Sequence, residues 1–202
     1  MKILITGATG LIGSHLVSTL LAHNYKDIRV LTTNLDRASK KLSSNIDIRI
    51  WNPLKSEIDL TALDNIDIVF HLAGENVAAS RWGHQRKERI LKSRTMATEL
   101  LLKTINSSST TPQKFISSSA IGIYGDKAEQ EVDEHSSYGS DFLAKVCQQW
   151  ESSLLKNDIK DMSSHVLRTG LVLSSNGGAL QKMLLPFKYG AGGKLGTGKQ
   201  YM

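Results

Sequence analysis

Short apolar runs alternate along this chain with longer stretches that have helical spacing. Apolar runs of strand length occur at residues 3–5, 28–31, 46–51, 66–72, 114–117 and 164–173. Between them, apolar residues recur at helical spacing in 16–21, 86–106 and 142–155. Alternation of this kind is typical of a parallel sheet with right-handed crossovers. We therefore predict an α/β fold, a doubly wound parallel sheet with helices on both faces.

The first apolar run leads directly into a glycine-rich turn. Residues 6–13 read Thr-Gly-Ala-Thr-Gly-Leu-Ile-Gly, and an amphipathic helix follows. Gly7 suits a tight strand-to-helix turn, Gly10 lets a pyrophosphate approach the main chain, and Gly13 lets the helix pack closely on the strand. The helix N-terminus also favours an anion. The pattern predicts a Rossmann dinucleotide-binding turn; the alternative is an ordinary strand-to-helix turn that is rich in glycine.

The end of the second strand indicates which dinucleotide binds. An NAD site of this type usually has an acid there, to hold the ribose hydroxyls, but this chain has Thr32 and Thr33, with Arg37 a little further on. Small hydroxyls and an arginine suit a ribose 2′-phosphate. We therefore predict NADP as the cofactor, with NAD as the alternative. Arg37, Lys40 and Lys41 can equally be read as a solvated helix face.

The third strand ends in Trp51 and Asn52. Both are placed to flank the adenine ring of a bound dinucleotide. The alternative is a core tryptophan followed by a turn asparagine.

The bulk properties narrow the class of protein. The chain has 202 residues, a net charge of +6 and one cysteine, Cys147. The charge suits an anionic small-molecule substrate and is too mild to require a nucleic acid. A single cysteine excludes an internal disulfide framework and fits a reducing cytosol, while polar residues and glycines interrupt the apolar N-terminus. We expect a cytoplasmic protein with no membrane partner, no metal site and no pattern that indicates an oligomeric state.

Three motifs give the chain a family resemblance. The glycine turn at 6–13, His-Leu-Ala-Gly at 71–74 and the serines 117–119 before Tyr124-Gly125 resemble the extended short-chain dehydrogenase/reductases. More specifically, the chain resembles their atypical epimerase-like branch, often called YfcH-type, at 72–77, 81–82, 92–94 and 177–202. The resemblance implies an NAD(P)-binding Rossmann domain at 1–175. Residues 176–202 would begin a small C-terminal substrate domain that we expect to be mostly missing, because the chain stops in a glycine-rich loop.

The resemblance also implies cofactor contacts, position by position. The pyrophosphate would be held by Gly7, Thr9, Gly10, Leu11, Ile12 and Gly13. The adenosine side would be lined by Leu72, Ala73 and Gly74. Ser117 and Ser119 would lie near the nicotinamide, and Gly170 would follow the sixth strand beside the cofactor.

The usual proton-transfer pair of the extended class is missing. A tyrosine normally has a lysine four residues later, and the lysine lowers the pKa of the phenol. None of the five tyrosines has such a lysine. Alignment on Glu151 puts Leu143 and Cys147 in the two places, whereas alignment on Lys145 puts Asp141 in the place of the tyrosine. In both registers the phenol is absent. The candidates left for a catalytic role are Ser119 and Lys145.

Residues 81–94 carry six lysines and arginines. One interpretation is an anion pocket in which Arg94, which replaces an asparagine of the class, and Arg81 hold a phosphate or carboxylate of the cofactor or substrate. A second is a nucleic-acid surface beside Trp82, and a third is a solvated helix face. We expect the chain to have no nucleic-acid partner.

Two functions remain open. The first is an NADP-binding oxidoreductase or nucleotide-sugar-epimerase-like enzyme that lacks the usual Tyr-x-x-x-Lys pair. The second is a non-catalytic dinucleotide-binding protein with a structural or sensing role. The missing pair favours the second function, and the glycine turn is compatible with both.

Overall fold

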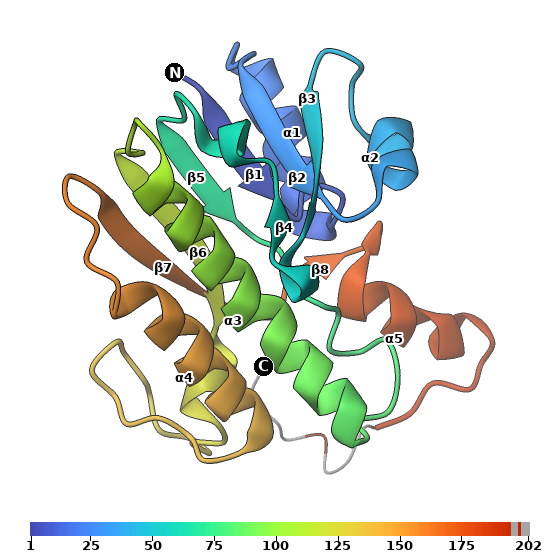
Figure 1. Ribbon diagram of the computed structural model, residues 1–202. Coiled ribbons are helices and arrows are strands. Elements are labelled where there is room, and N and C mark those ends of the chain that lie inside the picture. The colour runs from blue at the N-terminus through green and yellow to red at the C-terminus, as the bar shows by residue number, and fades with distance from the viewer. Residues whose placement is uncertain (195–197, 199–202) are drawn as a thin grey trace.

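The computed structural model describes residues 1–194 and 198. The strands are β1 (Ile3–Thr6), β2 (Ile28–Thr32), β3 (Asp47–Asn52), β4 (Glu57–Ile58), β5 (Ile68–His71), β6 (Lys114–Ala120), β7 (Ser163–Thr169) and β8 (Leu173–Ser174). The first seven form one sheet in the order β4-β3-β2-β1-β5-β6-β7 (Figure 1). Neighbouring strands are parallel, except that β4 runs antiparallel to β3. The order reverses between β1 and β5, where ligands of such sheets bind beyond the carboxyl ends of the strands.

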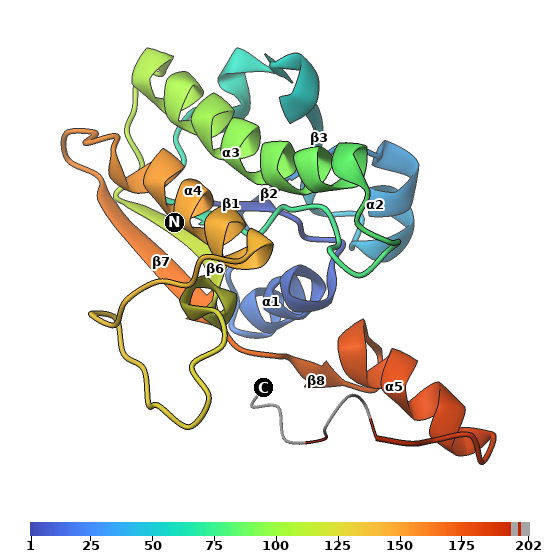
Figure 2. The ribbon, with the colours of Figure 1, turned by 90° about the horizontal axis from the view of Figure 1, so that it is seen from below.

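Helices cover both faces of the sheet. They are α1 (Leu11–Ala22), α2 (Leu35–Lys41), α3 (His84–Ser107), α4 (Phe142–Leu155) and α5 (Gly178–Lys188), with short 3-10 helices η1 (Pro53–Lys55), η2 (Leu60–Leu63) and η3 (Ile121–Tyr124). Helices α3 and α4 lie on one face, and α1 lies on the other (Figures 1 and 2). The predicted doubly wound α/β fold is therefore confirmed.

None of the described helices is long and apolar enough to span a membrane.

Alternate residues of the same strands supply two separate cores. Leu4 and Val69 pack toward α3 and α4, whereas Ile3, Ile5 and Val30 pack toward α1 and α2. Strands that are buried on both faces require nearly continuous apolar runs, which explains why β1 and β2 stand out in the sequence.

The predicted sixth strand at 164–173 is too long. Strand β7 ends at Thr169, which pairs with Ala120, the last residue of β6. Strand β7 lies at the edge of the sheet, so it has no further pairing partner once β6 has ended. The chain then forms β8, which bridges back to the first residues of α5.

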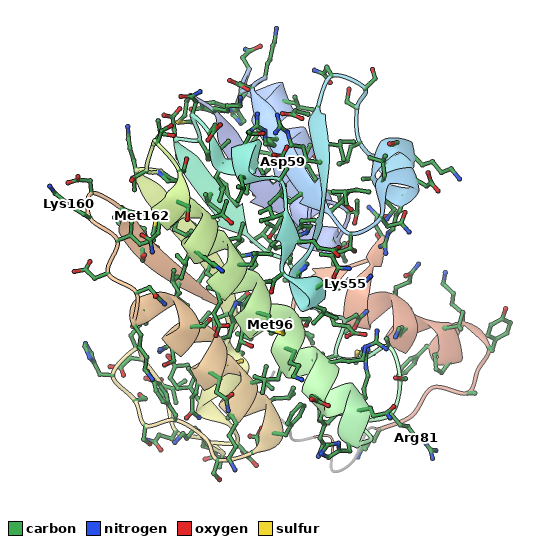
Figure 3. The ribbon with its side chains drawn as sticks, in the orientation of Figure 1. Lys55, Asp59, Arg81, Met96, Lys160 and Met162 are labelled. Carbon is green, nitrogen blue, oxygen red and sulfur yellow. The ribbon has the colours of Figure 1, made fainter. Side chains whose placement is uncertain are left out.

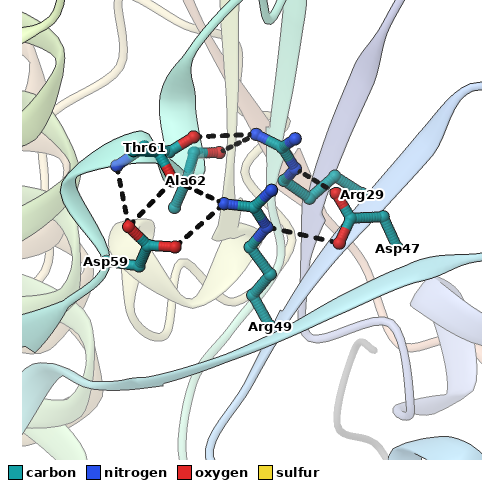
Figure 4. Close-up of polar contacts among 6 residues, drawn as sticks. All are labelled: Arg29, Asp47, Arg49, Asp59, Thr61 and Ala62. Atoms are coloured by element: carbon teal, nitrogen blue, oxygen red, sulfur yellow. Dashed lines mark hydrogen bonds and ion pairs between the residues drawn. The ribbon is translucent and has the colours of Figure 1, made fainter.

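A buried arginine braces the sheet at the end away from the ligand-binding edge. Arg29, in β2, is 4% exposed and donates to Asp47 (2.6 Å) and to the carbonyls of Thr61 and Ala62 (Figure 4). Burial alone would raise the pKa of Asp47, but hydrogen bonds and charges from Arg29 and Arg49 outweigh it and hold the pKa below its usual value. This network ties β2, β3 and η2 together.

Candidate cofactor site

The turn after β1 has the geometry of a phosphate-binding loop. Gly7 has φ +73°, and a Cβ there would lie 2.7 Å from the carbonyl carbon of Leu72. The Gly10 N–H donates to the Gly7 carbonyl (2.9 Å), and Gly10 is the N-cap of α1. Within the described chain no side chain caps α1. Its first N–H groups are therefore available to an anion.

Gly13 sets the distance between α1 and the turn. A Cβ at Gly13 would lie 2.3 Å from the Gly7 carbonyl oxygen and 2.8 Å from the Ala8 Cα. Both neighbours are main-chain atoms that cannot swing away. The close approach of helix to strand therefore requires glycine here, as the motif predicted.

A buried side-chain pair supports the turn from behind. Thr6 Oγ1 lies 2.8 Å from His71 Nδ1 and accepts a hydrogen bond from the Ala73 N–H (3.1 Å). Burial, with a smaller contribution from the charge of Arg94, lowers the pKa of His71 to about 3. His71 is therefore neutral and links β1 to β5, so it is not placed as a base.

A cavity of about 1440 Å³ opens at the carboxyl edge of the sheet. The structure brings thirteen of the predicted cofactor residues together on its wall: Gly7, Thr9, Gly10, Leu11, Ile12, Thr32, Thr33, Arg37, Trp51, Asn52, Leu72, Ala73 and Gly74. They come from both sides of the β1–β5 reversal. Segments far apart in the sequence therefore form one continuous surface.

Other predicted residues are not among the described residues that line this cavity: Gly13, Arg94, Ser117, Ser119, Lys145 and Gly170. Gly13 packs against the main chain of Gly7 and Ala8, so its role is to let helix and turn approach closely. Ser117 is buried and bonds the Ser118 carbonyl (3.2 Å). Gly170 follows β7 beside Ile121, and its neighbour Thr169 is the residue that lines the cavity.

The wall also includes residues that the sequence did not single out for it. Prominent among them are Lys41, Pro53, Glu75, Asn76, Arg89, Ser93, Ala97 and Asn176. Spacing could have revealed part of this set, because Arg89, Ser93 and Ala97 recur every four residues along one helix face. The β8 and α5 residues had no such signal, since their place depends on contact with Leu11.

Helix α2 supplies two cations at one end of the cavity. Arg37 and Lys41 both line it, and Lys41 Nζ donates to the Thr9 carbonyl (3.3 Å). Asn34 caps the helix by accepting from the Arg37 N–H (2.8 Å). Lys41 therefore reaches the glycine turn and Arg37 lines the same cavity, whereas Lys40 is not among the described wall residues.

Trp51 combines the two interpretations of the sequence. It is buried in the core beside His71, with ring centroids 6.4 Å apart, and it also lines the cavity with Asn52. A core tryptophan can thus present one edge to a ligand.

Arg94 lies behind the cavity wall. Its guanidinium donates to the carbonyls of Ile90 (2.9 Å) and Glu75 (3.1 Å), and its Cζ lies 5.1 Å from the centroid of the Trp150 ring. A Cβ on Gly74 would lie 3.0 Å from that Cζ. Arg94 therefore supports the main chain of the wall. Arg81, the other predicted anion ligand, is exposed and points away from the molecule (Figure 3).

Under α4, Ser119 belongs to a network of buried polar side chains. Ser119 is 3% exposed, and its hydroxyl donates to Glu151 (2.6 Å). Arg168 donates to both oxygens of the same carboxylate (2.9 and 2.8 Å). The hydrogen bond to Glu151 raises the pKa of Arg168, so the guanidinium stays charged. Lys145 is exposed on α4, so the structure does not bring it together with Ser119.

The same arginine holds two tyrosines. Arg168 bonds the hydroxyls of Tyr124 (2.8 Å) and Tyr138 (3.1 Å). The glycines that follow them also meet, because a Cβ on Gly139 would lie 2.7 Å from the Gly125 Cα. The loop between the two Tyr-Gly pairs is therefore closed at its base.

Cys147, which one of the two alignments puts in the place of the usual lysine, is buried in the core. Burial raises the pKa of its thiol, although the charge of Arg94 opposes the rise. The thiol is therefore protonated near neutral pH. Across residues 1–194 and 198, no three His, Cys, Asp or Glu side chains gather in a way that could hold a metal ion.

These features fit a bound dinucleotide: a glycine turn at a helix N-terminus, at the point where the strand order reverses, with cations at one end. The profile of the NAD dependent epimerase/dehydratase family matches residues 3–174. The chain belongs to this family.

Relatives and solved structures agree with that assignment. An epimerase family protein of Mycobacterium leprae is 32% identical over 198 residues, which are 98% of this chain and 61% of that protein. The human epimerase family protein SDR39U1, solved with NADPH, is 29% identical with a TM-score of 0.82 over 100% of this chain and 64% of its own. A nucleoside-diphosphate sugar epimerase of Corynebacterium glutamicum is 30% identical with a TM-score of 0.77, over 98% and 39%. The chain thus spans about three-fifths of the mycobacterial relative.

Proposed function

We propose that this chain is the NADP-binding part of an oxidoreductase or nucleotide-sugar-epimerase-like enzyme that acts on an anionic small molecule. The observation that carries the proposal is the glycine turn at the β1–β5 reversal, with Arg37 and Lys41 beside it in one cavity. The human relative solved with NADPH supports the choice of cofactor. The boundaries 1–175 for cofactor binding and 176–202 for the start of the substrate region belong to the same proposal, as does a cytoplasmic setting.

The residues of the turn and of α2 divide the work of binding. The N–H groups at the start of α1 hold the pyrophosphate, as Gly7 and Gly13 allow. Arg37 and Lys41 hold the 2′-phosphate of the adenosine ribose, because a guanidinium and an ammonium both pair with phosphate oxygens. Trp51 and Asn52 flank the adenine. The bound cofactor would supply the hydride chemistry.

A non-catalytic role is the second candidate, and a specific observation favours it. The hydroxyl of Ser119 donates to Glu151, and the sequence has no tyrosine with a lysine four residues later. A protein that holds NADP for structure or sensing needs no proton donor there. Oxidation of NADPH with a panel of carbonyl compounds and nucleotide sugars separates the two roles: steady turnover supports the enzyme, and none across the panel supports the second role.

Titration with both nucleotides tests the cofactor. We expect NADPH to bind more tightly than NADH and to raise the melting temperature. The Arg37→Ala variant should weaken NADPH binding about tenfold, because one charged hydrogen bond is lost, and should leave NADH binding unchanged. Lys40→Ala on the same helix is the matched control. Equal affinity for the two nucleotides, unchanged by Arg37→Ala, would contradict the assignment.

A further inference from the structure

Three arginines contact Glu75 at the wall of the cavity, two of them through its carboxylate. Arg86 and Arg89 both pair with Glu75 Oε1, the latter at 2.9 Å. Arg94 donates to the main-chain carbonyl of Glu75 (3.1 Å). One carboxylate therefore pairs with two guanidiniums while a third lies beside it, and the four side chains together keep a net positive charge. Such an excess inside a cavity attracts an anion.

Among the described residues that line the cavity, Arg89 is the member of this group that can meet a ligand. The side chain of Arg86 is mostly buried, and it is held by Glu75 and by the Asn76 carbonyl. Arg94 lies behind the wall. The side chain of Arg89 is 63% exposed, and Arg89 is the one of the three that lines the cavity. Glu75 thus orients Arg89, while the three arginines together still carry more positive charge than the one carboxylate can neutralise.

Helix α3 determines this placement. Arg89, Ser93 and Ala97 follow one another at intervals of four residues, so they share one face of the helix, and all three line the cavity. Ser93 Oγ accepts from the Glu75 N–H (3.1 Å), which fixes the loop after β5 against this face. The position of Arg89 is therefore fixed by the helix itself and by its contact with the loop after β5.

The guanidinium of Arg86 has one donor that no described residue satisfies. Its Nε is buried and has no hydrogen-bond partner within the part of the chain that the structure describes. A buried guanidinium donor that is left unpaired is costly. An anion bound at the adjoining Arg89 would lower that cost electrostatically.

This set is separate from the cations on α2. Figure 1 shows α2 and the first turns of α3 well apart, on different sides of the region that the strand ends face. A single phosphate bound by Arg37 and Lys41 on α2 would therefore leave Arg89 on α3 unused. The cavity wall therefore carries two separate positively charged regions, one on α2 and one on α3.

We infer that Arg89, with Glu75 and Asn76 beside it, forms a second anion subsite that binds a phosphate or diphosphate group of the substrate. The inference rests on the proposed function and names the chemical class of ligand that this site takes. The guanidinium would bind two phosphate oxygens through its parallel N–H donors. The cofactor's own pyrophosphate carries the same chemistry, so a test must separate the two sources.

Calorimetric titration of inorganic pyrophosphate into protein saturated with NADPH makes the separation, because the glycine turn is then filled. We expect the wild type to bind pyrophosphate and Arg89→Ala to weaken it about tenfold. Lys92→Ala is the matched control, since Lys92 lies on the same helix, pairs with Glu88 and is not among the described wall residues. It should change the affinity by less than about twofold. The affinity of Arg89→Ala for NADPH should stay at the wild-type value.

Three results would overturn the inference. Loss of NADPH affinity in Arg89→Ala by about tenfold would assign Arg89 to the cofactor's pyrophosphate. Absence of pyrophosphate binding to the NADPH-saturated wild type, or equal binding by wild type and Arg89→Ala, would remove the subsite. Failure of the wild type to bind NADPH would instead contradict the proposed function. In that case titration of the cofactor-free protein, wild type against Arg89→Ala, still shows whether Arg89 binds the anion.

Discussion

The glycine turn after β1 and the region under α4 contrast strongly, although both lie at the same edge of the sheet. The turn presents main-chain atoms to an open cavity, with Gly7 and Gly13 admitting no side chain. Under α4, Ser119, Glu151 and Arg168 are buried or nearly so and satisfy one another. The turn therefore leaves its polar main-chain groups open to a ligand. The polar side chains under α4 are instead already hydrogen-bonded to one another.

The contrast teaches that cofactor binding and proton transfer are separable in this fold. Binding depends mainly on the backbone geometry of the turn between β1 and α1, which β5 supports through His71 and Leu72. Proton transfer in the extended class depends on a tyrosine and a lysine of one helix, and no tyrosine of this chain has a lysine four residues later. We therefore expect changes under α4 to affect stability, and changes at the turn to affect nucleotide affinity.

The largest effect should come from Glu151→Ala. Removal of the carboxylate leaves the guanidinium of Arg168 without its ion pair, which costs about 3–5 kcal/mol in the free energy of unfolding. The affinity for NADPH should change by less than about threefold in the protein that still folds. Urea denaturation and nucleotide titration measure the two quantities, and Gln149→Ala on the exposed side of α4 is the control. A large loss of affinity at unchanged stability would break the contrast.

At the turn, Gly13→Ala should lower the free energy of unfolding by about 3 kcal/mol, because its methyl group meets main-chain atoms that cannot move away. Nucleotide binding should fall together with stability. The control is Gly122→Ala, where a Cβ would meet no described atom within 4 Å. Thermal melts with and without NADPH give both readouts. Wild-type binding by Gly13→Ala would show that the turn tolerates a wider helix–strand distance.

The pH dependence of stability tests the support behind the turn. The pKa of His71 is about 3 in the folded protein, below the usual value of about 6.5 in the unfolded chain. The unfolded state therefore takes up this proton first, and stability falls as the pH drops from about 6.5 toward 3. Between pH 7 and pH 5 the loss is about 2 kcal/mol. The His71→Gln variant should lack this slope in denaturation measured across that range, and an equal slope would place its origin elsewhere.

The smallest effect should come from Ser119→Ala. One hydrogen bond to Glu151 is lost while both bonds from Arg168 remain, so the cost is about 1 kcal/mol. Ser118→Ala, on the opposite face of β6, is the control, with chemical denaturation as the measurement. Once a substrate is known, loss of turnover in Ser119→Ala at unchanged NADPH affinity would indicate that Ser119 takes part in the reaction.

Local patterns predicted the parts that local geometry builds. The apolar runs revealed the parallel sheet because its strands are buried on both faces, and the spacing of Gly7, Gly10 and Gly13 revealed the turn. The site away from the turn was harder to predict. Ser119, Glu151 and Arg168 meet only when three distant segments pack, and no spacing encodes that meeting. Arg94 and Arg89 lie in the same basic run, and only the rotation of α3 decides which one faces the cavity.

The closed base of the loop between Tyr124 and Tyr138 has an evolutionary consequence. Because Arg168 donates to both phenols and Gly125 lies close to Gly139, the intervening segment is anchored at its two ends. Insertions or exchanges within it can then accumulate without disturbing the sheet. Such a segment is suited to diversify which molecules a common scaffold accepts.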